Sequence, residues 1–329
     1  MTLPLRLPVP GTQPELGDLR GRDFLAAADV SAAELEALLD EAAALKHEWA
    51  TRRAHARQPL AGRTVALLFQ KTSLRTLVSF ELAAQQLGGS SLYLADADVG
   101  VARRESAADV ARTLERWVDA LVARTFRHEL VEDLADAMTA PVVNALTDRE
   151  HPCQALADLL TLRERFGRLR GLVVAFVGEG NNVFASLAIA GAALGVEVRL
   201  AHPSGYGPDL GSLALARGSA MRHGGRVTLT HDPRTAVEGA HAVYADTWVS
   251  MGDEAEALER RRTFANYRVD SDLMARAGPE AIFLHCLPAH RGEEVTDEVI
   301  DGLQSAVFDQ AENRLHVQKA LLAGLLGEA

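Results

Sequence analysis

The amino-acid sequence predicts an α/β protein of two domains, each a parallel β-sheet flanked by helices. Short apolar runs alternate along the chain with segments of helical periodicity, and this alternation is typical of parallel sheets with right-handed crossovers. The alternation begins again at Leu172, after a long helical segment. A chain of 329 residues is also longer than a single hydrophobic core usually organises. We therefore expect two domains of similar build.

The first domain is expected to span residues 1–150. A capping box formed by Ser31 and Glu34 predicts the start of a helix in which apolar residues recur at helical spacing. The remaining patterns predict strands at residues 64–69, 91–95, 120–123 and 141–144, and helices at residues 80–87, 106–117 and 129–138.

The second domain is expected to span residues 151–311. A helix over residues 155–165 is predicted to bridge the two domains, and the chain is expected to end on an amphipathic helix, about residues 312–329, that packs back on the first domain. Between them the patterns predict a helix at residues 182–194 and strands at residues 172–177, 196–201, 226–229, 241–245 and 281–284.

Composition excludes several functions. The net charge is −11 and no polybasic run is present, which argues against nucleic acid as a partner. No apolar run approaches the ~20 residues needed to span a bilayer, and the first residues do not resemble a signal peptide. Two cysteines, Cys153 and Cys286, cannot form a disulfide framework. We expect a cytoplasmic protein without membrane association.

The segment between residues 69 and 81 carries the first functional signal. An apolar strand ends at Phe69, and a helix begins after Ser73, Arg75 and Thr76. A helix N-terminus attracts anions, and an arginine with two hydroxyl groups suits a phosphate dianion. The alternative is ordinary helix capping beside an exposed arginine.

Four further segments place polar side chains after strands or at helix starts. They are His151-Pro152-Cys153-Gln154, Gly178-Glu179-Gly180-Asn181-Asn182, residues 246–252 beginning with Asp246, and His285-Cys286-Leu287-Pro288. The glycine turn lacks the third glycine and the downstream acid of a dinucleotide site. The His and Cys residues lack C-x-x-C and H-E-x-x-H spacing. We therefore expect neither a cofactor nor a metal ion.

Taken together, these motifs resemble the aspartate/ornithine carbamoyltransferase family from about residue 20 to the end of the chain. The run F-x-K-x-S-x-R-T ending at Thr76 is similar to the carbamoyl-phosphate loop of that family, and H-P-x-Q starting at His151 is similar to its second motif. The segments D-x-x-x-S-M-G from Asp246 and H-C-L-P from His285 are similar to those of the ornithine branch.

The resemblance implies the role of each site residue. Arg116, His151, Cys286 and Arg314 would be catalytic. Carbamoyl phosphate would be bound by Ser73, Leu74, Arg75, Thr76, Arg116, His151, Pro152, Cys153, Gln154, Cys286, Leu287 and Arg314. Ornithine would be bound by Asn182, Asp246, Ser250 and Met251. Either Asp246 or Cys286 would manage the charge of the attacking amine.

The resemblance also implies an activity and an assembly. The expected reaction transfers the carbamoyl group of carbamoyl phosphate to the side-chain amine of L-ornithine, giving L-citrulline and phosphate in arginine metabolism, by a homotrimer or a multiple of trimers. The alternatives are a carbamoyltransferase for a related amine, such as an N-modified ornithine or putrescine, and a non-catalytic carbamoyl-phosphate-binding paralogue. Two positions depart from the family pattern: Leu77 stands where a second arginine is usual, and Gly100 where a glutamine is usual.

Overall fold

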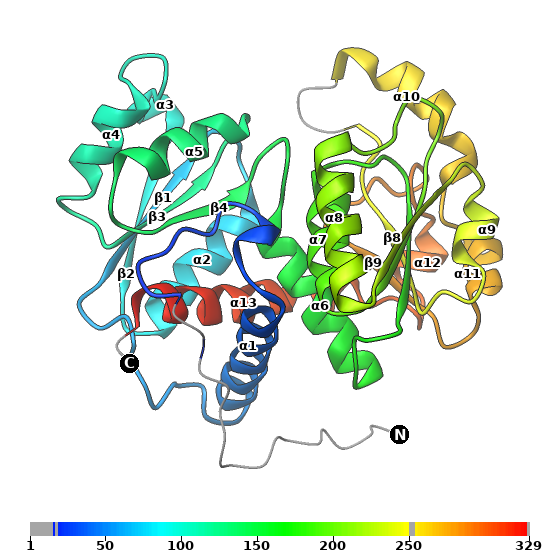
Figure 1. Cartoon of the computed structure of the whole chain (residues 1–329), viewed down its shortest axis with the longest axis horizontal. Coiled ribbons are helices and arrows are strands. Elements are labelled where there is room, and N and C mark those ends of the chain that lie inside the picture. The colour runs from blue at the N-terminus through cyan, green and yellow to red at the C-terminus, as the bar shows by residue number, and fades with distance from the viewer. Residues whose placement is uncertain (1–15, 17–18, 250–253, 328–329) are drawn as a thin grey trace.

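Two parallel β-sheets, each covered by helices on both faces, form the protein (Figure 1). The computed structural model describes residue 16 and residues 19–249 and 254–327. In the first sheet the strand order is β2-β1-β3-β4, and in the second it is β7-β6-β5-β8-β9. Every pair of neighbouring strands in both sheets is parallel. The predicted fold class is therefore confirmed.

The first sheet and its helices occupy the first half of the chain. The elements are α1 (Ala32–Arg52), β1 (Thr64–Phe69), α2 (Leu74–Gln86), β2 (Ser90–Ala95), α3 (Asp96–Val99), α4 (Ala107–Leu114), β3 (Ala120–Arg124), α5 (His128–Ala137), β4 (Val142–Leu146) and α6 (Pro152–Phe166). The predicted capping box is present at the start of α1: Oγ of Ser31 accepts from the Glu34 amide, and the Glu34 carboxylate accepts from the Ser31 amide.

The second half of the chain repeats the pattern. Its elements are β5 (Val173–Val177), α7 (Asn182–Ala193), β6 (Glu197–Ala201), α8 (Leu210–His223), β7 (Arg226–Thr230), α9 (Pro233–Val237), β8 (Ala242–Ala245), α10 (Ala257–Phe264), α11 (Ser271–Ala277), β9 (Ile282–His285), α12 (Asp297–Ile300) and α13 (Val307–Leu326). No helix among the described residues is long and apolar enough to cross a membrane.

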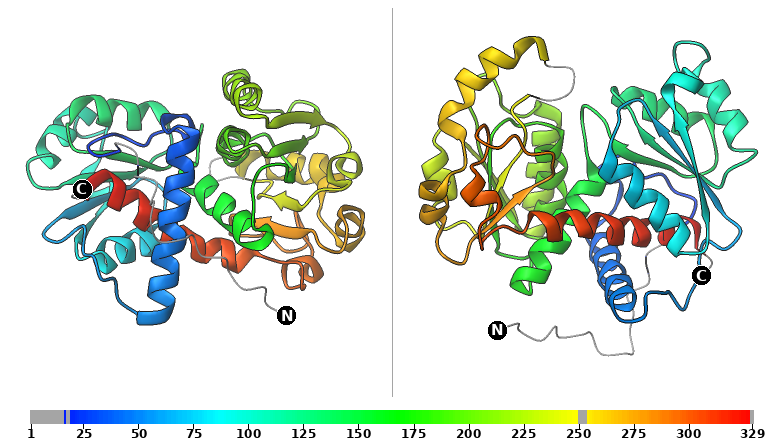
Figure 2. Two further views of the ribbon diagram at one scale, coloured as in Figure 1. Left: turned by 60° about the horizontal axis from the view of Figure 1, so that its bottom comes forward. Right: turned by 180° about the vertical axis from the view of Figure 1, so that it is seen from behind.

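Helices α6 and α13 join the two halves (Figures 1 and 2). Helix α13 packs on α1, α2 and α6, so the end of the chain returns to the first sheet as predicted. The largest hydrophobic cluster includes Leu67 of β1, Leu321 of α13 and Phe176 of β5, and therefore extends through both halves. Two smaller clusters cover the opposite face of each sheet.

The strand orders locate a binding site in each sheet. The chain leaves β1 toward β2 on one side and later returns to β3 on the other, and it does the same around β5 with β6 and β8. Ligands of open α/β sheets bind beyond the carboxyl ends of the strands at such reversals. The segments that follow β1 and β3, and those that follow β5 and β8, are therefore the places to look for function.

Several element boundaries differ from the predicted ones, among them those of three helices. Helix α4 ends at Leu114, although the pattern predicted helix up to residue 117. Helix α6 begins at Pro152, because proline fits the first position of a helix. Helix α13 begins at Val307, five residues before the expected start. The domain boundary between residues 150 and 151 stays a prediction.

Candidate active site

The first part of the site is the start of α2, at the carboxyl end of β1. Ser73 caps this helix, its Oγ accepting from the Thr76 amide at 3.2 Å and donating to Thr76 Oγ1 at 3.0 Å. Thr76 is fully buried, whereas the Leu74 side chain is 75% exposed. The backbone amide of Leu74 has no acceptor within the helix, because it lies in the first turn. It is therefore available to donate to a ligand.

Two arginines from distant parts of the chain converge on Thr76. Nη1 of Arg124, at the carboxyl end of β3, lies 3.3 Å from Thr76 Oγ1, and Nη2 of Arg314 from α13 lies 3.0 Å from it. Both guanidinium groups are buried. Half-buried Arg75 begins the same helix turn. The structure thus assembles three guanidinium groups at one end of the first sheet.

The electrostatics of this cluster favour an anion. Burial, together with the neighbouring charges of Arg314 and Arg75, lowers the pKa of Arg124 to about 10. Burial also lowers the pKa of Arg314 and of Arg75 from their usual values. Keeping each arginine charged in this buried position therefore costs free energy, and a bound dianion would offset that cost.

His151 and Gln154 complete the cluster from the start of α6. Arg314 Nη1 donates to Gln154 Oε1 at 2.8 Å and lies 3.5 Å from His151 Nε2. His151 is 3% exposed. Burial, followed by the charges of Arg314 and Arg124, lowers its pKa well below the usual value. His151 is consequently a neutral imidazole at neutral pH.

Several buried donors in the cluster have no acceptor among the described residues. They are Nε of Arg124, Nδ1 of His151 and Nε of Arg314. A buried donor without a partner costs about 1–3 kcal/mol, and native proteins rarely leave one unsatisfied. Three such donors close together indicate a binding site for a ligand that is rich in acceptor oxygens.

Arg116 does not belong to this cluster, which corrects the prediction made for it. Its exposed side chain sits in the turn that follows α4, before β3 begins. That turn lies at the amino end of the first sheet, whereas the cluster lies at the carboxyl end. Arg124 occupies the position that was expected of Arg116. The signal for Arg124 was available, because it is the polar residue that ends a buried strand.

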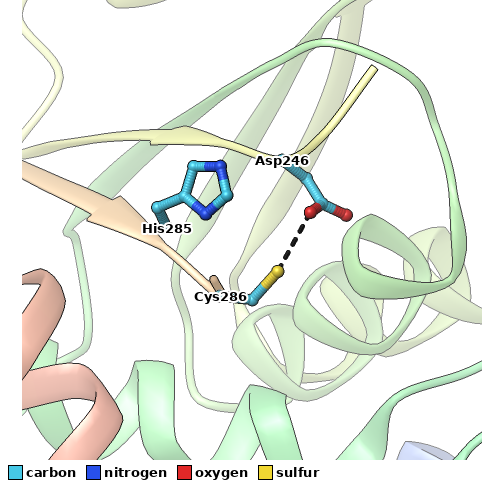
Figure 3. A group of neighbouring side chains, drawn as sticks. All are labelled: Asp246, His285 and Cys286. Atoms are coloured by element: carbon cyan, nitrogen blue, oxygen red, sulfur yellow. Dashed lines mark hydrogen bonds between the residues drawn. The ribbon is translucent and has the colours of Figure 1, made fainter. Parts of the chain in front are cut away.

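The second part of the site lies at the carboxyl ends of β5, β8 and β9. Asp246 follows β8 and accepts from three groups: Cys286 Sγ at 3.0 Å, Asn181 Nδ2 at 2.7 Å and the Thr247 amide at 2.8 Å. Figure 3 shows the Cys286 thiol directed at the Asp246 carboxylate. Asn181, which also caps α7, was not among the predicted site residues.

Cys286 is a protonated thiol in this arrangement. Burial raises its pKa well above the usual value, and the charge and hydrogen bond of Asp246 raise it further. The Asp246 carboxylate is therefore the acceptor of the pair. Ligand atoms of Asp246, His285 and Cys286 lie within 4.8 Å of one another, close enough to consider a metal ion. However, Nδ1 of His285 already accepts from the Leu287 amide, and Nε2 lies 3.2 Å from Glu294.

Contacts between the two halves bring these parts together. Asn182 Nδ2 donates to the Thr147 carbonyl beyond β4. The Leu287 amide is engaged by His285, so any backbone group that this residue offers to a ligand is its carbonyl. The Cys153 thiol donates to the Asn144 carbonyl at 3.5 Å, and Pro152 is the first residue of α6. Predicted residues Ser250 and Met251 lie outside the described residues.

The two departures from the family pattern have structural explanations. Leu77 is partly buried against the largest hydrophobic cluster, where a charged side chain would have to leave water. Gly100 ends α3 in the left-handed region, with φ of 69°. A Cβ atom at Gly100 would also lie 2.9 Å from Cβ of Arg104. Both residues therefore fit their own surroundings.

The fold and this site define a two-domain α/β protein with a buried cluster of arginines facing a carboxylate and a thiol. The model of the carbamoyl-P binding domain of aspartate/ornithine carbamoyltransferases matches residues 22–164, and the model of the Asp/Orn binding domain matches residues 170–325. The chain belongs to the aspartate/ornithine carbamoyltransferase family.

Named relatives are similar over nearly their whole lengths. The chain is 53% identical over 307 residues to an ornithine carbamoyltransferase of Symbiobacterium thermophilum, covering 92% of this chain and 97% of the relative. It is 50% identical to the anabolic ornithine carbamoyltransferase of Pyrococcus furiosus, covering 94% and 98%. A solved ornithine carbamoyltransferase structure from P. furiosus superimposes with a TM-score of 0.92 at 49% identity, covering 95% of this chain and 99% of that one.

Proposed function

We propose that this enzyme transfers the carbamoyl group of carbamoyl phosphate to the side-chain amine of L-ornithine, giving L-citrulline and phosphate. The observation that carries the proposal is the set of buried, unpartnered donors on Arg124, His151 and Arg314. Carbamoyl phosphate offers both a phosphate dianion and a carbonyl oxygen to such donors. Relatives at about half identity over most of the chain bear the name of this reaction.

The start of α2 would hold the phosphate group. Oγ of Ser73, the backbone amides of Leu74 and Arg75 and the guanidinium of Arg75 lie at this helix start, and we assign Arg124 in place of Arg116. Arginines bind a phosphate bidentately and stay charged. They would therefore stabilise the phosphate as it departs with the electrons of the broken carbon–oxygen bond.

His151, Gln154 and Arg314 would act on the carbamoyl group. Attack by the amine places negative charge on the carbonyl oxygen, and fixed donors aimed at that oxygen lower the barrier. Arg314 is held by Gln154 and Thr76, so it needs little reorganisation during the reaction. The carbonyl of Leu287 is suited to accept from the amide nitrogen of the carbamoyl group.

Asn182, Asp246, Ser250 and Met251 would bind ornithine. An amine with a pKa of ~10.4 requires roughly 4–5 kcal/mol to lose its proton at pH 7. Cys286 is a poor acceptor for that proton, because its thiol is itself protonated. The Asp246 carboxylate is therefore the group that we assign to orient the amine and to accept its proton.

Assembly and location complete the proposal. We propose a homotrimer, because exposed apolar side chains line one side of the first domain: Leu74 and Val78 of α2 and Leu92 and Tyr93 of the edge strand β2. An exposed apolar edge strand is a liability unless another chain covers it. The free cysteines Cys153 and Cys286 support a cytoplasmic location. Light scattering coupled to size-exclusion chromatography tests the trimer.

Colorimetric detection of ureido products tests the reaction. The enzyme is supplied with carbamoyl phosphate and, separately, L-ornithine, Nα-acetyl-L-ornithine, N-succinyl-L-ornithine and putrescine. We expect product with L-ornithine and little with the others. A preference for putrescine or a modified ornithine would overturn the substrate assignment, and no product with any amine would favour a non-catalytic paralogue.

A further inference from the structure

Arg260 of α10 is a buried cation outside the site described above. Its residue exposure is 7%, although two arginines and a glutamate surround it in the sequence. Nη1 donates to Glu179 Oε2 at 2.7 Å, and Nη2 lies 3.4 Å from Glu179 Oε1. This fork-to-fork arrangement fixes both direction and distance between the two side chains.

The same guanidinium contacts a third segment of the chain. Nη1 also donates to the Trp248 carbonyl at 3.1 Å, and the Arg260 guanidinium carbon lies 5.2 Å from the ring centroid of Tyr206. The Trp248 ring packs on Phe264, one helical turn beyond Arg260, with ring centroids 6.1 Å apart. Arg260 therefore joins α10 to the turn after β5 and to the segment after β8.

Those two segments carry the residues assigned to ornithine. Glu179 stands two residues before Asn181 and three before Asn182, and Trp248 stands two residues after Asp246. Asn181 and Asp246 are themselves in contact, with Nδ2 and Oδ2 2.7 Å apart. The spacing between the two segments is thus held at one point by that contact and at a second point by Arg260.

We propose that Arg260 is a positioning residue for the amino-acid substrate. Paired with Glu179 and bonded to the Trp248 carbonyl, it sets the separation between Asp246 and Asn182 that ornithine requires. The inference rests on the proposed function, because it assumes that these two residues bind the amino acid.

The expected effect is selective. Among the described residues Arg260 bonds to Glu179, Glu256 and the Trp248 carbonyl, beside the ornithine residues, whereas Arg75, Arg124 and Arg314 face carbamoyl phosphate. Loss of the pair should therefore weaken ornithine binding and leave carbamoyl phosphate binding intact. A purely structural role would lower the amount of folded enzyme and so the apparent kcat, and it would leave both KM values unchanged.

Steady-state kinetics of Arg260→Gln, Arg260→Lys and Glu179→Gln test the proposal, with Arg261→Gln as the matched control. Arg261 is next in the chain but has a half-exposed side chain that pairs with Glu293. We expect KM for ornithine to rise at least about tenfold in Arg260→Gln and Glu179→Gln, since each loses a charged hydrogen-bonded pair. KM for carbamoyl phosphate should stay within about twofold, and Arg261→Gln should match the wild type.

Two further comparisons sharpen the test. Arg260→Lys should recover only part of the ornithine affinity, because an ammonium group cannot bond Glu179 and Trp248 in the geometry of a fork. The double variant Arg260→Gln/Glu179→Gln should resemble either single variant, because both changes remove the same pair. Wild-type KM for ornithine in Arg260→Gln, or equal changes in both KM values, would overturn the inference. Failure of the wild type to form citrulline would overturn the proposed function instead, so the two failures are distinguishable.

Discussion

Asp158 accepts a hydrogen bond from Gln154 Nε2 at 2.8 Å, one turn along α6. This contact fixes the orientation of the Gln154 amide, so that its oxygen faces Arg314. Asp158 Oδ1 also accepts from Gln310 Nε2 at 2.6 Å, and Gln310 Oε1 accepts from the His285 amide. One buried carboxyl group thus connects the carbamoyl end of the site to the strand that precedes Cys286.

Asp158 predicts a pH dependence of stability. Burial raises its pKa from 3.8 to about 7. Between these values the unfolded state has released the proton and the native state retains it, so this group makes stability fall as pH rises from about 4 to about 7. Asp158→Asn retains an acceptor oxygen but cannot ionise. Its stability relative to the wild type should rise across that window by on the order of 3 kcal/mol.

Thermal unfolding of both proteins at pH 5 and pH 8 measures this change. The difference in melting temperature should move in favour of Asp158→Asn at the higher pH. An identical difference at the two pH values would show that Asp158 is ionised in the native state throughout.

Substituting Arg124 and Arg116 one at a time should show which of the two binds carbamoyl phosphate. Arg124→Gln removes a buried guanidinium that contacts Thr76, and we expect kcat/KM for carbamoyl phosphate to fall about 10- to 100-fold. Arg116→Gln alters an exposed turn and should leave the same quantity near the wild-type value. A large loss in Arg116→Gln with an active Arg124→Gln would restore the original prediction.

Arg75→Ala should remove most activity without unfolding the protein. Arg75 is half-buried beside the start of α2, and burial lowers its pKa, which indicates a cation placed for an anionic ligand. A charge-assisted bond to phosphate is typically worth ~1.5–3 kcal/mol. Circular dichroism checks the fold, and near-normal kcat/KM for carbamoyl phosphate would argue against this assignment.

Lys319 predicts a second pH effect, in the opposite direction. Its buried Nζ lies 3.0 Å from His55 Nε2 and 4.6 Å from the ring centroid of Trp49. Burial lowers its pKa from 10.5 to about 8. Between these values the unfolded state binds more protons, so the wild type should gain stability as pH rises from about 8 to about 10.5. Lys319→Met lacks this gain.

The comparison of wild type and Lys319→Met at pH 7.5 and pH 10 checks this effect. The wild type should gain about 2 kcal/mol on the variant between these conditions. A pH-independent gap would mean that Lys319 keeps an ordinary pKa in the folded protein.

The sequence predicted the layers of the fold well because their signals are local. The capping box at Ser31 and the apolar run of β1 depend only on nearby residues, and both appear where expected. The role of Arg116 was assigned from the family resemblance, but α4 ends at Leu114 and leaves Arg116 in the exposed turn that follows it.

The site contacts that the sequence could not predict join residues that are far apart in the chain. The approach of Arg314 to Gln154 joins residues 160 positions apart, and the bond of Gln310 to Asp158 spans 152 positions. Local periodicity carries no information about which face of α13 meets α6. The family resemblance named Arg314, whereas the supporting role of Asp158 became visible only from the packed structure.

The return of α13 to the first domain has a consequence for biosynthesis. Domains generally fold in the order in which the ribosome releases them. Here Val317, Leu321 and Leu325 of α13 contribute to the core that covers β1, and Arg314 completes the basic cluster. A nascent chain therefore lacks one wall of its amino-terminal domain until α13 has left the exit tunnel. The first domain and its basic cluster can be completed only after the whole second sheet has been synthesised.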